Sequence, residues 1–562
     1  MIKKDTRITI ENQQNDFSYK KNKSNLNINF NRISFIFFIF FFIFLIYSIH
    51  LIHLGSRKAK LEDIKGINQI SNKLYRADIV DRSQKYLAKT VSSIDIGISP
   101  SKIIDEEKLL LNLRYIFPDK DYTKIRKRIK DDKFFYFEKK ISQENYEKLM
   151  EIGDKSIESR DNLIRIYPQK NLFSHIIGQI DNDNNGISGL EKSFDQNLKK
   201  TKRFVQLTVD RDIQYLIRNE LTKFNKIFNT KGSAAILMNV NNGEILSLVS
   251  LPDFDPNKRE KITDVNFINR VTKGVYEFGS VFKTFTLAAA FNEKIIEPKT
   301  EFVNLPKSLT CAGFPIREYN EKLPTNLTSE EILIRSGNIG SVKIAQEIGE
   351  EKYKSFLSKL GILEKINFDI EEIGKPIKFN WGKCPLATAS FGHGITTTLL
   401  QVVKAYSIIV NGGFDIKPVL IKSKKKNERK KIINEEVSKK ILPILRKIVT
   451  TEDGTAKLAN VAGYEIGGKT GTANKTKKGV YTNKKINTFI SVFPTSKPKF
   501  ILAIMLDEPE INKDYIYEYR DGSNFKLKGS PRNTAGWNSV EVTGHIVDKI
   551  GPILATKLTE VY

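Results

Sequence analysis

Ser280 and Lys283 are residues of this sequence whose types and spacing indicate chemistry. They lie in the segment Gly279–Lys283, which is followed by the helical pattern TFTLAAAF. Residues three apart share one face of a helix, so we expect the Lys283 amine beside the Ser280 hydroxyl. A serine hydroxyl becomes a good nucleophile when a neighbouring base removes its proton. A lysine acts as that base when burial or nearby cations favour its neutral form. Alone, S-x-x-K is a weak signal, because most such matches are surface helix turns.

A second segment, Ser336-Gly337-Asn338, follows the helical pattern ILIR. It supplies another hydroxyl for proton transfer, from Ser336, and an amide, from Asn338, that can bind a substrate carbonyl. An ordinary Ser-Gly-Asn turn has the same composition, so this segment carries weight only in combination with the others.

A third segment, Gly467–Ala473, reads GGKTGTA and alternates hydroxyl-bearing with small residues. This alternation is typical of a strand edge on which an extended peptide can lie. Lys469 with the hydroxyls of Thr470 and Thr472 would bind a carboxylate, and Gly471, which lacks a Cβ, permits close approach. The competing interpretation is a Gly-rich bend in a sheet.

Strand and helix patterns on both sides of these motifs indicate the elements that position them. The runs 234–240 and 244–251 flank Asn241-Asn242-Gly243, a strong hairpin signal. A second pair of strands is predicted at 486–493 and 499–506. Helical patterns cover 284–292, 400–409 and 538–558. Hairpins at both ends with helices between them predict an α+β fold, an antiparallel sheet covered by helices.

The segment from Ile33 to Ile52 reads ISFIFFIFFFIFLIYSIHLI and contains no charged residue. As a helix it is about 30 Å long, which matches the hydrocarbon core of a bilayer. We therefore expect an uncleaved transmembrane anchor at residues 33–53, because the run is too long for a signal peptide and lacks a cleavage pattern. Basic residues before it favour a cytoplasmic N-terminus, although Arg57, Lys58 and Lys60 on the other side weaken that signal.

Composition narrows the remaining possibilities. The chain has 562 residues, a formal net charge of +27 and 40% hydrophobic residues, which is sufficient for more than one core. The basic residues are scattered and are not interleaved with aromatic ones, so we expect a solvated lysine-rich surface and no nucleic-acid partner. Two cysteines, Cys311 and Cys384, exclude a disulfide scaffold and a Cys-based metal site. They are able to pair in an oxidising compartment, which the sequence leaves open.

The order S-x-x-K, S-x-N and K-T-G is the signature of penicillin-binding proteins and serine β-lactamases. With these motifs, the chain resembles the class B penicillin-binding proteins, and within them the division-type peptidoglycan D,D-transpeptidases. Further matching segments are RADIVDR, RIYP with SHIIG, GISGLEKSFD, LTVDRDIQ, NGEILSLVSLPDFDPN, FGHGITTTLLQ, AGYEIGGKTGTA and TAGWNSVEV. The chain departs from the usual family pattern at Ala77, at Ser83-Gln84 and at Leu399, none of which is a catalytic group.

The resemblance implies that Ser280 attacks the penultimate D-Ala of a D-Ala-D-Ala stem peptide, and that β-lactam antibiotics acylate the same residue. Lys283 would be the base, and Ser336 with Lys469 would relay the proton to the leaving amine. The backbone N–H groups of Ser280 and Thr472 would form the oxyanion hole.

In the same family pattern, Asn338 would orient the substrate, and Thr470 and Thr472 would hold its carboxylate beside Gly471. The resemblance implies no cofactor and no metal.

For the whole chain we expect a cytoplasmic tail (1–32), the transmembrane anchor (33–53), an elongated pedestal of the dimerisation type (54–202) and a penicillin-binding transpeptidase domain (203–562). The catalytic domain would be periplasmic. Expected partners are peptidoglycan stem peptides, β-lactams, the inner membrane, a glycan polymerase and divisome membrane proteins. Alternatives are an elongation-type transpeptidase, a membrane-anchored serine β-lactamase, a β-lactam sensor and a non-catalytic divisome scaffold.

Overall fold

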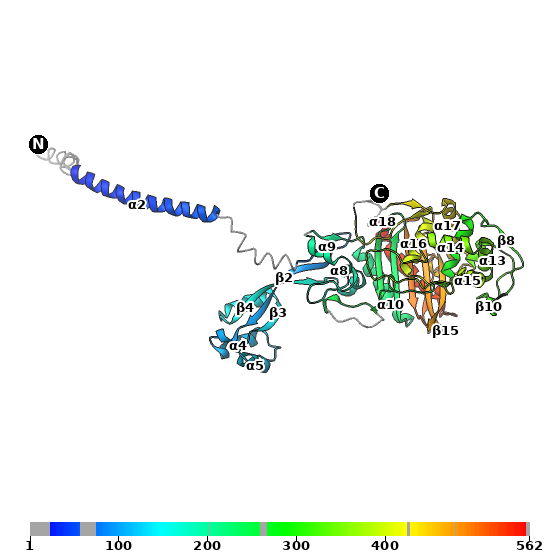
Figure 1. Cartoon of the computed structure of the whole chain (residues 1–562), viewed down its shortest axis with the longest axis horizontal. Coiled ribbons are helices and arrows are strands. Elements are labelled where there is room, and N and C mark those ends of the chain that lie inside the picture. Colours follow the sequence, from blue (N-terminus) through cyan, green and yellow to red (C-terminus); the bar gives the residue numbers. More distant parts are fainter. Residues whose placement is uncertain are drawn as a thin grey trace. The chain divides into compact units, whose positions relative to one another are not determined.

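The structure, a computed structural model, describes residues 23–56, 75–201, 203–258, 267–423, 428–477 and 479–557. It divides into two compact units, Met1–Lys73 and Leu74–Tyr562. In the first unit, helix α2 (Lys23–Ser56) contains a segment, Ser34–His53, that is long and apolar enough to cross a membrane (Figure 1). The helix begins upstream of the predicted span. The predicted tail up to residue 22 and the basic residues at 57, 58 and 60 lie outside the described residues.

The N-terminal part of the second unit contains a five-stranded sheet in the order β3-β2-β1-β5, with β4 also paired to β2. Its strands are β1 (Ile79–Val80), β2 (Tyr86–Ile98), β3 (Phe135–Ile141), β4 (Ile157–Ile166) and β5 (Val205–Gln206). Its helices are α4 (Glu106–Ile116), α5 (Tyr122–Lys130), α6 (Gln143–Glu151), α7 (Ser174–Ile177), α8 (Gly189–Ser193) and α9 (Asp195–Lys200). Apolar residues of β2, β3, α4, α5 and α6 form a small core of their own.

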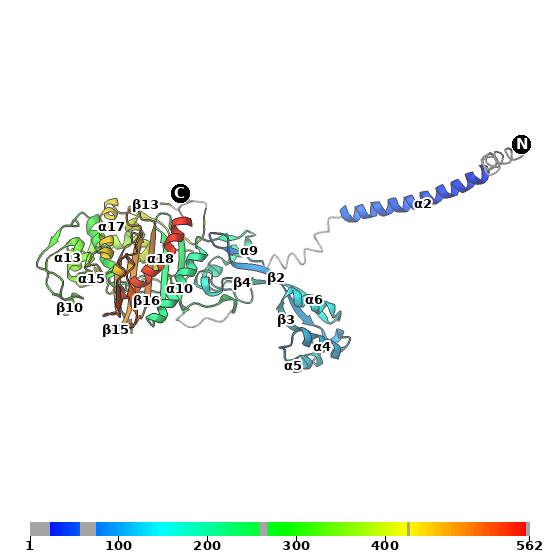
Figure 2. The ribbon, with the colours of Figure 1, turned by 180° about the vertical axis from the view of Figure 1, so that it is seen from behind.

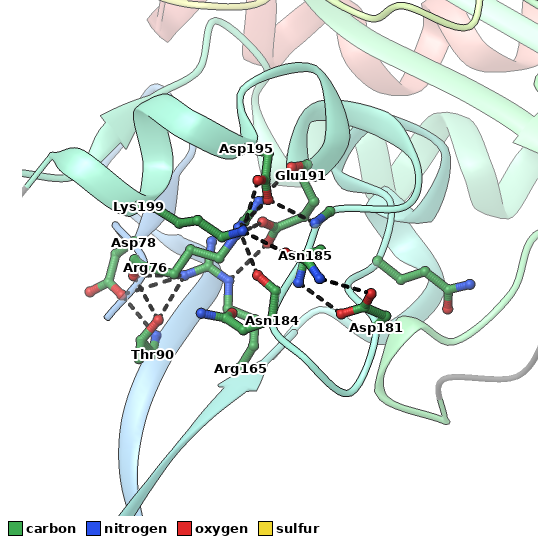
Figure 3. A network of polar contacts seen from close by, with 12 residues as sticks. Arg76, Asp78, Thr90, Arg165, Asp181, Asn184, Asn185, Glu191, Asp195 and Lys199 are labelled. Carbon is green, nitrogen blue, oxygen red and sulfur yellow. Dashed lines mark hydrogen bonds and ion pairs between the residues drawn. The ribbon is translucent and has the colours of Figure 1, made fainter. Parts of the chain in front are cut away.

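A buried ion-pair network links separate segments of this N-terminal part (Figure 3). The Arg76 guanidinium donates to the Glu191 carboxylate and, at 2.7 Å, to Asp195 Oδ1. Arg165 Nε donates to Glu191 Oε1 at 2.8 Å. The network thereby joins the three sequence segments that contain Arg76, Arg165 and Glu191. All three segments precede the S-x-x-K motif in sequence. Since unpaired buried charges are costly, each member of the network depends on the others.

The second sheet carries the K-T-G segment at its edge. Its order is β14-β15-β16-β6-β7, and all neighbouring strands are antiparallel. The strands are β6 (Gly232–Asn239), β7 (Ile245–Leu251), β14 (Gly467–Lys477), β15 (Val480–Phe493) and β16 (Phe500–Asp507). Every residue of β6, β7 and β16 is buried, which explains their nearly continuous apolar runs. The two predicted hairpins are confirmed as β6–β7 and β15–β16.

Helices cover both faces of this sheet. One group consists of helices α10 (Arg211–Ile227) and α18 (Ser539–Lys557), which contact each other and the sheet. The second group consists of α16 (Leu399–Val410) and α17 (Glu435–Thr450), which also contact the sheet. Figures 1 and 2 show the sheet between the two groups. The remaining helices are α11 (Phe282–Asn292), α12 (Ser329–Ile334), α13 (Asn338–Ile348), α14 (Glu350–Lys359) and α15 (Lys383–Ala389). The predicted α+β class, an antiparallel sheet covered by helices, is confirmed.

Four two-stranded antiparallel sheets complete the strands of this unit that the structure describes. They pair β8 (Glu301–Phe302) with β11 (Leu327–Thr328), β9 (Ser308–Cys311) with β10 (Phe314–Arg317), β12 (Phe414–Asp415) with β13 (Lys430–Lys431), and β17 (Ile516–Glu518) with β18 (Lys526–Lys528). Cys311 at the end of β9 forms a disulfide with Cys384 in α15, with 5.5 Å between the two Cα atoms. The pairing that the sequence left open is therefore made, and it ties the β9–β10 hairpin to the helical part.

Candidate active site

Ser280 lies in a single 3-10 turn, Gly279–Val281, directly before α11. Gly279 adopts a φ of +55°, a left-handed conformation that glycine accepts without a Cβ penalty. The turn packs against β14, so closely that a Cβ on Gly279 would lie 2.7 Å from the Thr472 carbonyl oxygen. Ser280 is partly exposed and lines a cleft of about 980 Å³, together with Ser336, Asn338, Thr470 and Thr472. The cleft therefore brings the three sequence motifs together.

Lys283 lies one turn further along, in α11, and its side chain is 1% exposed. Its amine donates to the Ser336 carbonyl oxygen at 2.5 Å, to Asn338 Oδ1 at 2.7 Å and to Ser336 Oγ at 3.2 Å. Within the described residues it makes no hydrogen bond with Ser280 Oγ. The direct pairing of Ser280 with Lys283 that helical spacing suggested is therefore not formed here, because the Ser336–Asn338 loop offers the amine three oxygens.

Ser336 lies at the junction of two helices and between two lysines. Helix α12 begins at a capping box made by Thr328 and Glu331, and it ends just before Ser336. Ser336 has a φ of +57°, a conformation usually filled by glycine after a helix, which costs about 1–2 kcal/mol for an L-residue. Lys469 Nζ donates to Ser336 Oγ at 2.9 Å, and the Lys283 amine donates to the same oxygen at 3.2 Å. One hydroxyl thus contacts both amines.

The charge state of these lysines follows from their burial. Desolvation lowers the pKa of Lys283 to about 7, and the carboxylate of Glu318 opposes this effect. Desolvation also lowers the pKa of Lys469 well below its ordinary value, and the nearby Lys283 lowers it further. Because each charged amine disfavours charge on the other, a neutral lysine is available near neutral pH. A neutral amine can accept the proton that a serine hydroxyl loses when it attacks a carbonyl carbon.

Asn338 begins helix α13, and residues at the end of the β9–β10 hairpin bind it through hydrogen bonds. Glu318, directly after β10, accepts hydrogen bonds from the backbone N–H groups of Asn338 and Ile339 at 2.6 and 2.8 Å. The Asn338 side chain donates to the Arg317 carbonyl oxygen at 2.7 Å and accepts from Lys283. A carboxylate at a helix N-terminus satisfies backbone donors that have no partner within the helix. Sequence reasoning missed Glu318, since nothing in its local pattern marks it.

The K-T-G segment forms the edge strand β14, as predicted. Thr470 Oγ1 lies 2.8 Å from Thr455 Oγ1, and Thr472 Oγ1 accepts from the Ala535 N–H at 3.0 Å. Both threonines line the cleft. Gly471 instead packs against the turn before α11, where a Cβ would lie 2.2 Å from the Phe278 carbonyl oxygen. The close approach that Gly471 permits in this structure is that of the chain's own Ser280 turn.

No group of three or more His, Cys, Asp or Glu residues that could hold a metal ion occurs among the residues that the structure describes. Three hydroxyls and an amide line the cleft beside Ser280, from Ser336, Thr470, Thr472 and Asn338, and two buried amines contact Ser336 behind them. Proton transfer and binding of a carbonyl and a carboxylate are what these groups can do.

Comparison with known proteins agrees with this geometry. The family model "Penicillin binding protein transpeptidase domain" matches residues 233–523, and "Penicillin-binding Protein dimerisation domain" matches residues 72–227. The chain is 27% identical over 499 residues to the "Probable peptidoglycan D,D-transpeptidase FtsI" of Caulobacter vibrioides, covering 86% of this chain and 82% of that protein. It is 30% identical to the "Peptidoglycan D,D-transpeptidase FtsI" of Buchnera aphidicola, covering 78% of this chain and 83% of that protein.

A solved structure, penicillin-binding protein 3 from Mycobacterium tuberculosis in complex with aztreonam, has the same fold. The TM-score is 0.65 at 20% identity, over 86% of this chain and 97% of that chain. Since the transpeptidase model covers more than half of the 562 residues and the relatives match over most of their length, this chain belongs to the penicillin-binding proteins, as a class B peptidoglycan D,D-transpeptidase of the FtsI type.

Proposed function

We propose that this chain cross-links peptidoglycan stem peptides through an acyl-enzyme on Ser280, in septal wall synthesis during cell division. In the first step Ser280 Oγ bonds to the carbonyl carbon of the penultimate D-Ala, and the peptide bond to the terminal D-Ala breaks. In the second step an amine of a neighbouring stem bonds to that carbon, and the bond to Ser280 Oγ breaks. The amine loses a proton, and Ser280 regains one.

Proton transfer in the first step is assigned to the two lysines and Ser336. Neutral Lys283 takes the Ser280 proton as Oγ attacks, after a shift of its amine away from the Ser336–Asn338 loop. Ser336, which accepts a hydrogen bond from Lys469 at 2.9 Å, passes a proton to the departing amine. Ser336 regains a proton from Lys469.

Substrate binding is assigned to the cleft side of β14 and to Asn338. Thr470 and Thr472, with Lys469, hold the terminal carboxylate through charge-assisted hydrogen bonds. Asn338 orients the peptide carbonyl, and Gly471 lets β14 approach the turn that carries Ser280. The backbone N–H groups of Ser280 and Thr472 form the oxyanion hole.

One observation carries this proposal. The Lys283 and Lys469 amines lie 3.2 and 2.9 Å from the same hydroxyl, Ser336 Oγ, and Ser336 lines one cleft with Ser280. Two buried amines that contact one hydroxyl are costly, and groups with pKa values perturbed in this way cluster at functional sites.

Labelling with a fluorescent penicillin tests the proposal directly. The full-length protein in detergent is expected to form a covalent adduct, and Ser280→Ala is expected to form none. If the wild type is not labelled, or if Ser280→Ala labels equally well, the acyl-enzyme proposal fails. Rapid hydrolysis of the penicillin by the wild type would instead indicate a β-lactamase.

The division role is supported by the FtsI-type relatives, and localisation tests it. A fluorescent fusion at midcell in dividing cells agrees with septal synthesis. A fusion along the sidewall indicates the elongation-type alternative. Aztreonam, which is bound in the structural relative, is expected to acylate Ser280 as other β-lactams do.

We further propose that the apolar helix anchors the chain once in the inner membrane, with the N-terminus cytoplasmic and the transpeptidase domain in the periplasm. The proposed domains are those of the sequence prediction, the pedestal at 54–202 and the transpeptidase domain at 203–562. A glycan polymerase and divisome membrane proteins would bind through the anchor and pedestal. Protease added to spheroplasts is expected to degrade the domain after the anchor; protection of that domain would reverse the orientation.

A further inference from the structure

The disulfide between Cys311 and Cys384 lies close to the active site in the fold, and the proposed acyl transfer does not use it. Cys311 ends β9, and Cys384 lies in α15 (Figures 1 and 2). These are the two cysteines of the chain, so the bond contains every cysteine sulfur that the chain has. Both residues are half-buried, which leaves the bond within reach of a small thiol.

The β9–β10 hairpin depends on this bond for its attachment to the helical part. Its two strands form a sheet of their own, and a two-stranded hairpin is marginally stable in water. Ser308, Thr310 and Pro315 are exposed, whereas Leu309 and Ile316 are half-buried and pack against the large core. Two apolar side chains and the disulfide therefore carry much of the attachment.

The hairpin carries the groups that bind Asn338. Arg317, the last residue of β10, accepts a hydrogen bond from the Asn338 side chain at 2.7 Å through its carbonyl oxygen. Glu318 accepts from the backbone N–H groups of Asn338 and Ile339. Asn338 Oδ1 in turn accepts from Lys283 Nζ at 2.7 Å. A chain of hydrogen bonds thus connects the hairpin to the amine that is assigned as the base.

Helix α15, at the other end of the disulfide, packs on the helices of the site. It contacts α13, which begins at Asn338, and α13 contacts α11, which contains Lys283. The Ser390 carbonyl oxygen, directly after α15, accepts from Thr286 Oγ1 of α11 at 2.8 Å. The disulfide therefore ties the hairpin to the helices that position the Lys283 amine.

We propose that the Cys311–Cys384 disulfide is a site of thiol–disulfide exchange that controls the acylation of Ser280. With the bond formed, the hairpin binds Asn338 in the position described, and acylation is fast. With the bond reduced, the hairpin is attached by non-covalent contacts alone, and acylation is slow. This inference rests on the proposed acyl transfer at Ser280 and adds a control of its rate.

The reductant is a dithiol, and the exchange has two steps. One thiolate of the dithiol bonds to one cysteine sulfur, the cysteine S–S bond breaks, and the other cysteine leaves as a thiolate that takes up a proton. The second thiol of the reagent loses its proton and attacks its own sulfur in the mixed disulfide, which releases the second cysteine. Two electrons and two protons pass to the protein, and the dithiol becomes a cyclic disulfide.

The test compares the oxidised and reduced states of the full-length protein in detergent. Dithiothreitol reduces the protein and is then removed in oxygen-free buffer, and a chromogenic thiol reagent counts the free thiols. The readout is the pseudo-first-order rate constant of labelling by a fluorescent penicillin, measured below the Tm of the reduced protein. We expect reduction to lower this rate constant by about 10- to 100-fold, the range for loss of one hydrogen bond to a charged group. Reoxidation is expected to restore it.

Two kinds of variant make the test specific. The double variant Cys311→Ala, Cys384→Ala is expected to label at the rate of the reduced wild type, both before and after treatment with the dithiol. Glu318→Gln already weakens the binding of Asn338, so reduction is expected to slow it by a smaller factor than the wild type. Exposed Glu321→Gln, the matched control, is expected to show the full effect of reduction. If the double variant does not fold, reduction and reoxidation of the wild type decide the question.

The outcomes separate this inference from the proposed function. Equal labelling rates in the oxidised and reduced wild type overturn the inference and leave the acyl transfer intact, even where reduction lowers the Tm. A folded protein in which dithiothreitol exposes no thiol overturns it as well. An equal slowing of Glu318→Gln and the wild type on reduction refutes the path through Asn338. A wild type that is labelled in neither state overturns the proposed function.

Discussion

The pH dependence of acylation is the sharpest test of the site, because it reports on the Lys283 amine. A lysine with the ordinary pKa of 10.5 is neutral in roughly 0.03% of molecules at pH 7. With a pKa of about 7, Lys283 is neutral in about half of them at that pH. Burial therefore raises the population of the base by about 1,000-fold at neutral pH.

The expected profile follows from the sign of this change. Since only the neutral amine accepts the Ser280 proton, the acylation rate rises with pH. It increases about tenfold per pH unit on the acidic side and levels off above the pKa of Lys283. The half-maximal rate is expected near pH 7. Pseudo-first-order labelling of the full-length protein by a fluorescent penicillin between pH 5 and 9 measures it. A rate independent of pH in this range, or one still rising steeply at pH 9, refutes the assignment of Lys283 as the base.

Glu318→Gln sharpens the same experiment. The Glu318 carboxylate raises the pKa of Lys283 against the effect of burial. Its removal is therefore expected to lower that pKa further and to move the half-maximal rate to a lower pH. The amide also accepts less strongly from the Asn338 and Ile339 N–H groups, so the plateau rate is expected to fall. Glu321→Gln, an exposed change in the same loop, is the matched control. A midpoint that stays in place or moves to higher pH contradicts the argument.

The remaining predictions concern packing and stability. Gly471→Ala places a Cβ 2.2 Å from the Phe278 carbonyl oxygen and is expected to abolish penicillin labelling. Labelling at the wild-type rate would show that β14 shifts away from the Ser280 turn without loss of activity, which contradicts the prediction. Glu191→Ala removes the buried carboxylate that two buried guanidinium groups share and is expected to lower the free energy of unfolding by about 3–5 kcal/mol. Exposed Glu144→Ala should leave the Tm unchanged, and equal Tm values for the two variants would disprove the role of the network. Cys384→Ser opens a loop with a sequence separation of 73 residues and is expected to cost about 4 kcal/mol in urea unfolding, whereas an unchanged midpoint would contradict the entropic argument.

Local patterns in the sequence predicted much of the site. The S-x-x-K motif located Ser280 and Lys283 at the N-terminal end of a helix, where Ser280 lies in the 3-10 turn before α11 and Lys283 in α11, and alternation indicated that Lys469 to Thr472 form an edge strand. The Asn-Gly turn and the apolar runs predicted both hairpins of the sheet. These features depend on hydrogen bonds and side-chain periods within a few residues, which is why the sequence alone determined them.

Other features were decided only when distant segments packed together. The Lys283 amine contacts Ser336 and Asn338, which lie more than 50 residues away in sequence, and not Ser280, which lies three residues away. The left-handed conformation of Ser336 and the cap that Glu318 provides depend on a hairpin and on two helices. Which groups surround an amine, and therefore its pKa, is a property of burial and of neighbours far along the chain. The sequence thus determined which chemical groups are present and on which elements, whereas the tertiary structure determined their contacts and their charge.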